Sequence, residues 1–160
     1  MGKLSHIDQQ GKSRMVDVGN KSVTRRTAVA QVTVSFPPEV YQTLQQTQLT
    51  IAKGSITDTA NVAGIMAAKR TAELIPMCHP LPIDFCKIEF TQKDQTNSLV
   101  IQAEVRVTHK TGVEMEALTA AAVAALTVYD MCKALSHDIH INDLHLVNKT
   151  GGKSDFKTEA

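Results

Sequence analysis

The sequence predicts an α+β domain in which an antiparallel sheet carries its helices on one face. Apolar and polar residues alternate in stretches at residues 27–36, 84–90, 99–107 and 139–147, as in strands with one buried side. Helical stretches separate the first strand from the second, and a long alanine-rich segment separates the third from the fourth. The resulting order, β-α-α-β-β-α-β, is the split βαβ pattern.

The first strand and the two segments after it have clear local signals. Residues 27–36 place alanines and valines on one face, and Pro37 and Pro38 then stand where the first turn of a short helix tolerates proline. A loop through residues 51–56 precedes a second helix that Ser55 or Thr57 caps and Pro76 ends. One face of this helix consists of small side chains, which indicates that another segment approaches it closely: Ala60, Ala63, Gly64, Ala67 and Thr71.

The second half of the chain predicts a hairpin, a long helix and a closing strand. The turn-like stretch "KDQTN" joins the second and third strands. The alanine-rich helix is predicted from Glu114 to Leu135. Its uncharged part, residues 117–129, is shorter than the roughly 20 residues that span a membrane. We therefore expect a soluble helix.

Composition indicates one globular domain. The chain has 160 residues, 42% of them apolar, and a formal net charge of +1, with no charged block typical of nucleic-acid or membrane-surface binding. Residues 1–14 are expected to be a poorly ordered segment, and residues 15–160 a single catalytic domain with a flexible glycine-rich loop near its C-terminus. The start of the chain lacks the apolar core of a secretory signal, and the three cysteines lack C-x-x-C spacing, so we expect a cytoplasmic protein without disulfides or a zinc ribbon.

The alanine-rich helix contains charged residues at both ends. Asp130 and Lys133 are three residues apart, which makes their side chains neighbours on a helix. They could form an exposed ion pair, or a partly dry pair whose shifted pKa values suit acid and base chemistry. Glu114 and Glu116 lie in the predicted first turn, where carboxylates interact favourably with the positive end of the helix dipole. Glu116 and Asp130 lie about 21 Å apart along the axis, so a small ligand that needs both requires a site shared between two chains.

Other candidate residues lie outside this helix. Cys78 and His79 stand between two prolines that stiffen the backbone, which favours a rigid histidine at a pocket mouth over a metal pair. His137, His140 and His145 do not predict a metal site, because on a strand the last two point to opposite faces. The stretch "KTGGKS" is not a phosphate-binding P-loop, but its glycines beside Lys149 and Lys153 could wrap phosphate oxygens or form a frayed tail. Lys53 and Lys69 add further cations.

Three classes of function follow from these features. An RNA-binding module is disfavoured, because aromatic residues make up 4% of the chain and Phe85 and Phe90 point to opposite sheet faces. A structural or metal-handling oligomer accounts for the small-residue helix faces but not for Asp130, Lys133 and His79. An enzyme that acts on a phosphorylated small molecule at a subunit interface accounts for both.

Long stretches of the chain resemble a known family. "MVDVG", "AKGSITDTANVAGIMAAKRTAELIPMCHPL", "KTGVEMEALTAAAVAALTVYDMCKAL" and "KTGGKS" are similar to the cyclic pyranopterin monophosphate synthase family, molybdenum cofactor biosynthesis protein C, from Met15 to Ser154. The resemblance implies a ferredoxin-like subunit and a homohexamer, a trimer of dimers, with sites at the dimer interface. It implies a lyase that converts 3′,8-cyclo-7,8-dihydroguanosine 5′-triphosphate to cyclic pyranopterin monophosphate and diphosphate.

The resemblance also implies roles for individual residues. Asp130 would be the catalytic acid or base, with Lys133 beside it. The implied substrate-binding residues are Met77, Cys78, His79, Glu114, Met115, Glu116, Lys53 and Lys69, and we expect Lys149 and Lys153 to close over phosphate. No cofactor is required and no protein metal site is expected, while Mg²⁺ with the triphosphate or diphosphate is left open. The alternative is a non-catalytic oligomer that binds a phosphorylated ligand.

The chain departs from the family pattern at three positions. Ser55 stands where an acidic residue is common, Met77 where leucine is common, and Asp155 where a glycine is expected after "GGKS". The methionine is a volume-conserving apolar replacement.

Overall fold

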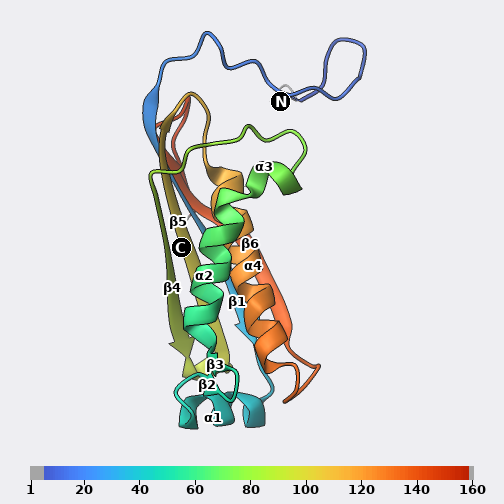
Figure 1. Cartoon of the computed structure of the whole chain (residues 1–160), viewed down its shortest axis with the longest axis vertical. Helices are drawn as coiled ribbons and strands as arrows, with labels where there is room; N and C mark the ends of the chain where they lie inside the picture. Colours follow the sequence, from blue (N-terminus) through green and yellow to red (C-terminus); the bar gives the residue numbers. More distant parts are fainter. Residues whose placement is uncertain (1–5, 159–160) are drawn as a thin grey trace.

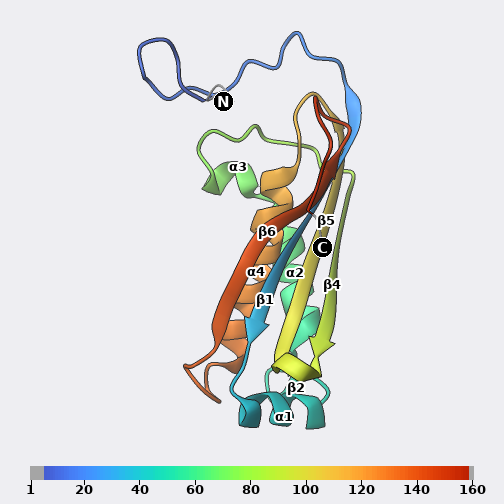
Figure 2. The ribbon, with the colours of Figure 1, turned by 180° about the vertical axis from the view of Figure 1, so that it is seen from behind.

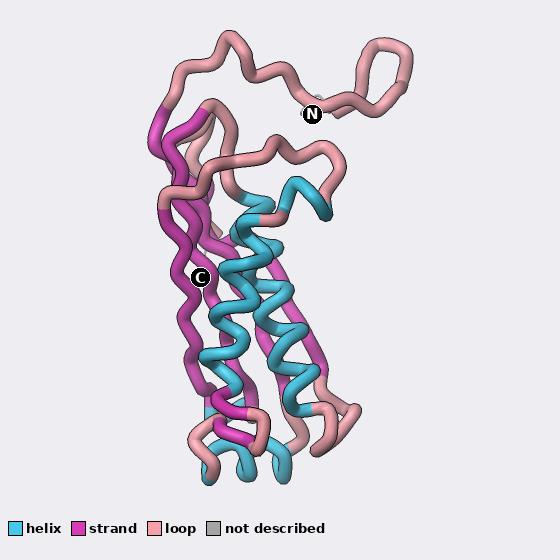
Figure 3. The backbone as a smooth tube through the Cα atoms, in the orientation of Figure 1, coloured by secondary structure: helices cyan, strands magenta, loops and turns pink. Residues whose placement is uncertain are grey.

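The computed structural model describes residues 6–158. Its main sheet has five antiparallel strands in the order β4-β5-β1-β6-β7. The helices α2 and α4 cover one face of this sheet (Figures 1 and 3), and the view from behind shows the other face without helices (Figure 2). The predicted α+β class and the split βαβ order of the four long strands are therefore confirmed.

The elements have the following bounds: β1 Thr24–Ser35, α1 Pro38–Gln46, β2 Thr50–Ile51, β3 Gly54–Ser55, α2 Ile56–Lys69, α3 Thr71–Leu74, β4 Phe85–Lys93, the 3-10 turn η1 Asp94–Thr96, β5 Ser98–His109, α4 Glu114–Cys132, β6 His140–Thr150 and β7 Phe156–Lys157.

The central strand β1 carries the middle of the core. Every second residue from Ala28 to Val34 is fully buried, and so is every second residue from Ile101 to Val107 of the neighbouring strand β5. The two strands are in register, with Ala30 opposite Ala103. These side chains face α4, so the period-2 alternation in the sequence reports the buried face of the sheet.

Helix α2 begins where the sequence predicted it and ends earlier. Ser55 is its N-cap, and the Ser55 hydroxyl accepts a hydrogen bond of 3.2 Å from the Asp58 N–H. The serine that departs from the family pattern thus has a capping role. The predicted end at Pro76 was wrong, because the helix stops at Lys69 and the buried Thr71 hydroxyl donates to the Ala68 carbonyl at 3.0 Å.

Smaller differences concern chain segments that are too short for a periodic signal. The predicted loop at residues 51–56 contains the two-residue strands β2 and β3, and Lys53 lies in the turn between them. Helix α4 ends at Cys132 rather than Leu135, which makes Lys133 its C-cap. Strand β7 extends the sheet by pairing with β6.

Helices α2 and α4 pack closely and run in opposite directions (Figure 1). At their contact a side chain on Gly64 would overlap the Ile88 methyl group. It would also lie 2.9 Å from the Ala120 carbonyl oxygen and 3.3 Å from the Ala124 Cβ. The small-residue face predicted from the sequence therefore packs against α4, with Ala60, Gly64 and Ala67 buried.

Helix α4 has the length and hydropathy of a membrane-spanning helix, as does the core helix of many soluble proteins. In its most apolar window, 56% of the residues are buried inside the domain, between the sheet and α2. Its alanines are thus accounted for by packing inside the domain.

We expect Gly64→Val to lower the free energy of unfolding by about 2–3 kcal/mol, because the added side chain overpacks the contact between the two helices. Urea unfolding followed by circular dichroism measures the change. Met66→Val, at an exposed position of the same helix, is the matched control and should change stability by less than about 0.5 kcal/mol. Equal stability of the two variants would contradict the close packing.

Candidate active site

A pocket with a volume of ≈ 480 Å³ lies where α4 begins. Five segments line it: the chain before β1, the start of β1, the loop after α3, the turn before α4 with the first turn of that helix, and the end of β6 with its glycine-rich loop. The pocket brings together most residues that were predicted to bind substrate: Met77, Cys78, His79, Glu114, Met115, Glu116, Lys149 and Lys153. Its size is in the range of small-molecule sites.

The glycine-rich loop is held against the start of β1 by local geometry. Gly151 has a φ of +82°, and a side chain there would overlap the Arg25 carbonyl oxygen. The Thr24 hydroxyl donates to the Gly151 carbonyl at 2.7 Å, and the Gly151 N–H donates to the Asp155 carboxylate at 3.1 Å. Asp155, the third departure from the family pattern, therefore fastens the loop that carries Lys153.

Two further cations line the pocket and were missed by the sequence reasoning. Arg26 lies at the start of β1, where its Nε donates to the His109 carbonyl at 3.1 Å, and Lys21 lies in the segment before the strand. Arg26 had a usable signal, because it is in phase with the buried Ala28 and Ala30, where a charge is out of place. Lys21 precedes any periodic segment and had none.

Glu116 is the buried carboxyl group of the pocket. Its residue is 4% exposed. The pKa of Glu116 is raised from 4.5 to about 7, mainly by burial; a backbone hydrogen bond lowers it and the nearby Glu114 carboxylate raises it within that net shift. Burial, and then the Glu116 charge, also raise the pKa of the Cys78 thiol. The pocket thus holds a carboxyl group that exchanges its proton near neutral pH, and a thiol that stays protonated.

Asp130 and Lys133 lie at the opposite end of α4. Their side chains form an ion pair of 2.6 Å and are 62% and 49% exposed, so of the two alternatives the single chain shows the exposed ion pair. The reason is helical phase: Met131 and Cys132 face the core, whereas Asp130 lies on the same side as the exposed Leu126.

The pair also shifts the pKa values of both groups away from neutrality. The hydrogen bond from Lys133 lowers the pKa of Asp130, and the charge of Lys53 lowers it further. The bond to Asp130 in turn raises the pKa of Lys133. In the single chain both groups are therefore held in their charged forms.

The two remaining predicted lysines, Lys53 and Lys69, lie at opposite ends of the α2–α4 pair. Lys53 belongs with Asp130, because its charge acts on that carboxylate. Lys69 lines a second pocket of ≈ 230 Å³ that shares Glu116 and Leu81 with the first. The predicted residues thus form two groups, separated by about 21 Å along α4. Figure 1 shows these two ends of the helix pair.

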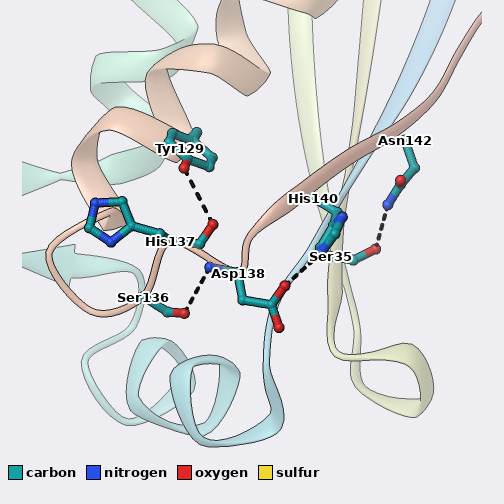
Figure 4. Close-up of polar contacts among 7 residues, drawn as sticks. All are labelled: Ser35, Tyr129, Ser136, His137, Asp138, His140 and Asn142. Carbon is teal, nitrogen blue, oxygen red and sulfur yellow. Dashed lines mark hydrogen bonds and ion pairs between the residues drawn. The ribbon is translucent and has the colours of Figure 1, made fainter.

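Polar contacts fix the loop between α4 and β6, residues 133–139 (Figure 4). The Tyr129 hydroxyl donates to the His137 carbonyl at 3.4 Å, and the Ser136 hydroxyl accepts from the Asp138 N–H at 3.0 Å. His140 pairs with Asp138 at 2.7 Å. Within residues 6–158 no three histidine, cysteine or acidic side chains form a metal-binding group.

Replacing Glu116 by glutamine should show by how much the buried carboxylate lowers the free energy of unfolding. The folded protein holds an extra proton between pH 4.5 and about 7, so stability falls as pH rises through this window. We expect Glu116→Gln to be more stable than the unmodified protein at pH 8, by up to about 3 kcal/mol. The difference should vanish below pH 4.5, where the carboxyl group is protonated in both states.

Urea unfolding across this pH range measures the difference. Glu39→Gln, which removes one carboxylate from an exposed position in α1, is the control for the change in net charge. A Glu116→Gln difference that does not vary with pH would contradict a raised pKa.

Comparison with known proteins identifies the family of the chain. The profile of the MoaC family matches residues 15–152. A cyclic pyranopterin monophosphate synthase of Xanthomonas oryzae pv. oryzae is 54% identical over 154 residues, which cover 96% of this chain and 93% of that protein. One of Thermomicrobium roseum is 51% identical, with 96% and 92% covered. The Drosophila melanogaster molybdenum cofactor biosynthesis protein 1 is 51% identical over 98% of this chain, which spans 27% of that protein. The chain belongs to the MoaC family.

Proposed function

We propose that this protein is a cyclic pyranopterin monophosphate synthase in molybdenum cofactor biosynthesis. It would be a lyase that converts 3′,8-cyclo-7,8-dihydroguanosine 5′-triphosphate to cyclic pyranopterin monophosphate with release of diphosphate. This chain covers 93% and 92% of the length of the two relatives above that carry this name. The observation that carries the proposal is the pocket at the start of α4, which combines a buried carboxyl group whose pKa is about 7 with four cations.

The residues of this pocket fit the two demands of the reaction. Opening and closing a guanine-derived ring needs proton transfer in both directions, and a carboxyl group with a pKa of about 7 serves both. Cyclising a phosphate while diphosphate leaves develops negative charge, which cations stabilise. The pocket cations are Lys21, Arg26, Lys149 and Lys153.

Asp130, Lys133 and Lys53 would complete the site from a second chain. Their distance from Glu116, about 21 Å along one helix, is too long for one small substrate to contact both ends within a chain. Their exposure leaves them free to meet the pocket of a partner subunit. Apolar side chains exposed beside them on α2 and α4, Val62 and Leu126 among them, support burial between subunits. We propose a homohexamer, a trimer of dimers, in the cytoplasm.

No resident cofactor is needed in this proposal. The conversion is a rearrangement with loss of diphosphate, so it requires proton transfers and charge stabilisation, both of which the side chains can supply. Any Mg²⁺ would accompany the phosphates of the substrate or of the released diphosphate.

The direct test is to incubate the purified protein with the cyclised dihydro-GTP substrate and to follow diphosphate together with the pterin product. Equal amounts of the two products support the synthase. A folded oligomer that leaves the substrate intact would contradict it, and would favour a non-catalytic oligomer that binds a phosphorylated ligand.

Asp130→Asn should lower turnover by at least about a hundredfold while the protein stays folded, because the substitution removes a general acid or base from an exposed position. Glu89→Gln is the matched control, since Glu89 forms an equally exposed ion pair with Lys87 at 2.7 Å on the edge strand β4. Turnover is measured in the same product assay. An Asp130→Asn variant with full activity would remove this residue from the mechanism.

A further inference from the structure

One cation of the pocket already has a partner within the chain. Lys149 Nζ lies 3.0 Å from Glu114 Oε1, and the two side chains are 32% and 31% exposed. Lys149 comes from β6 and Glu114 from the first residue of α4, so this ion pair crosses the pocket. A phosphate group that is to bind Lys149 must therefore displace, or share the lysine with, a carboxylate of the protein.

The position of that carboxylate depends on Gly112. A Cβ atom at Gly112 would overlap Glu114 Oε2 and would lie 2.7 Å from its Cδ and 2.8 Å from its Oε1. The carboxylate thus occupies the space that a side chain at residue 112 would fill. The φ of Gly112 is outside the positive range, so an alanine fits the backbone there, and the three atoms nearest to its Cβ all belong to the flexible Glu114 side chain.

We propose that Gly112 is a positioning residue which, by having no side chain, holds the Glu114 carboxylate against Lys149, where it competes with the leaving diphosphate for that lysine. This inference rests on the proposed function. A partly exposed ion pair is weak, so a multiply charged anion displaces it on binding. When the diphosphate departs, Glu114 takes Lys149 back, and this intramolecular competition favours product release.

The test is the affinity for inorganic diphosphate, measured by isothermal titration calorimetry on the assembled protein. Gly112→Ala and Glu114→Gln should each bind diphosphate about two- to fivefold more tightly, the range that a partly exposed ion pair accounts for. The double variant Gly112→Ala/Glu114→Gln should match Glu114→Gln alone, because Gly112 acts only through the carboxylate. In a Lys149→Met background neither change should alter the affinity, which the other cations sustain.

Gly19→Ala is the matched control. A Cβ atom at Gly19 would lie 3.1 Å from the Asp17 carboxylate. This carboxylate accepts a hydrogen bond from the Gly19 N–H, whereas the Glu114 carboxylate pairs with a lysine. This variant should bind diphosphate as the unmodified protein does. The inference would be overturned if Gly112→Ala and Glu114→Gln both bound diphosphate more weakly. It would also be overturned if the two changes tightened diphosphate binding in the Lys149→Met background as much as in the unmodified protein.

The turnover assay keeps this inference separate from the proposed function. If turnover is normal and Gly112→Ala binds diphosphate as the unmodified protein does, the role of Gly112 alone would be overturned. The predicted affinity pattern in a protein without turnover would overturn the synthase proposal and support the exchange of Lys149 between carboxylate and anion.

Discussion

The close contact between α2 and α4 is the constraint on which the rest of the structure depends. Gly64 lets the two helices approach until the Ala120 carbonyl and the Ala124 methyl group lie where a side chain would otherwise stand. Because the helices run in opposite directions (Figure 1), each end of the pair gathers residues that are far apart in the sequence. Lys69 joins Glu116 at one end, and Lys53 joins Asp130 at the other.

The two ends differ in electrostatic character. At the start of α4, burial raises the pKa of Glu116 to about 7, so this carboxyl group both gives and takes protons near neutrality. At the end of α4, the mutual ion pair lowers the pKa of Asp130 and raises the pKa of Lys133 while both remain in water. A second chain that covered this pair would strip its water and oppose both shifts. The proposed shared site would thus supply the dry surroundings that Asp130 and Lys133 lack in the single chain.

Sequence patterns predicted the parts of the fold that repeat and missed those that depend on single contacts. Alternation located β1 and β5, since it follows directly from burial of one sheet face, and Ser55 marked the start of α2 through its capping chemistry. The end of α2 at Lys69 was missed because the buried Thr71 continues the small-residue face while the backbone leaves the helix.

The candidate site divides in the same way. Residues carried by long motifs, such as His79 and Glu116, do line the pocket, whereas Lys21 comes from a segment without periodicity. The sequence left open whether Asp130 is exposed, because its buried neighbours in the sequence lie on another side of the helix. Which charged groups are buried depends on how segments pack against one another, and no local sequence pattern encodes that packing.

Subunit complementation tests most directly whether the site is shared between chains. Asp130→Asn and Glu116→Gln subunits, each expected to be inactive alone, are given different tags, dissociated, mixed and reassembled. If one chain supplies Glu116 and its partner supplies Asp130, mixed dimers contain one intact site, and random mixing restores about a quarter of the unmodified activity. Mixed assemblies that carry both tags and show no activity above the separate variants would contradict the shared site.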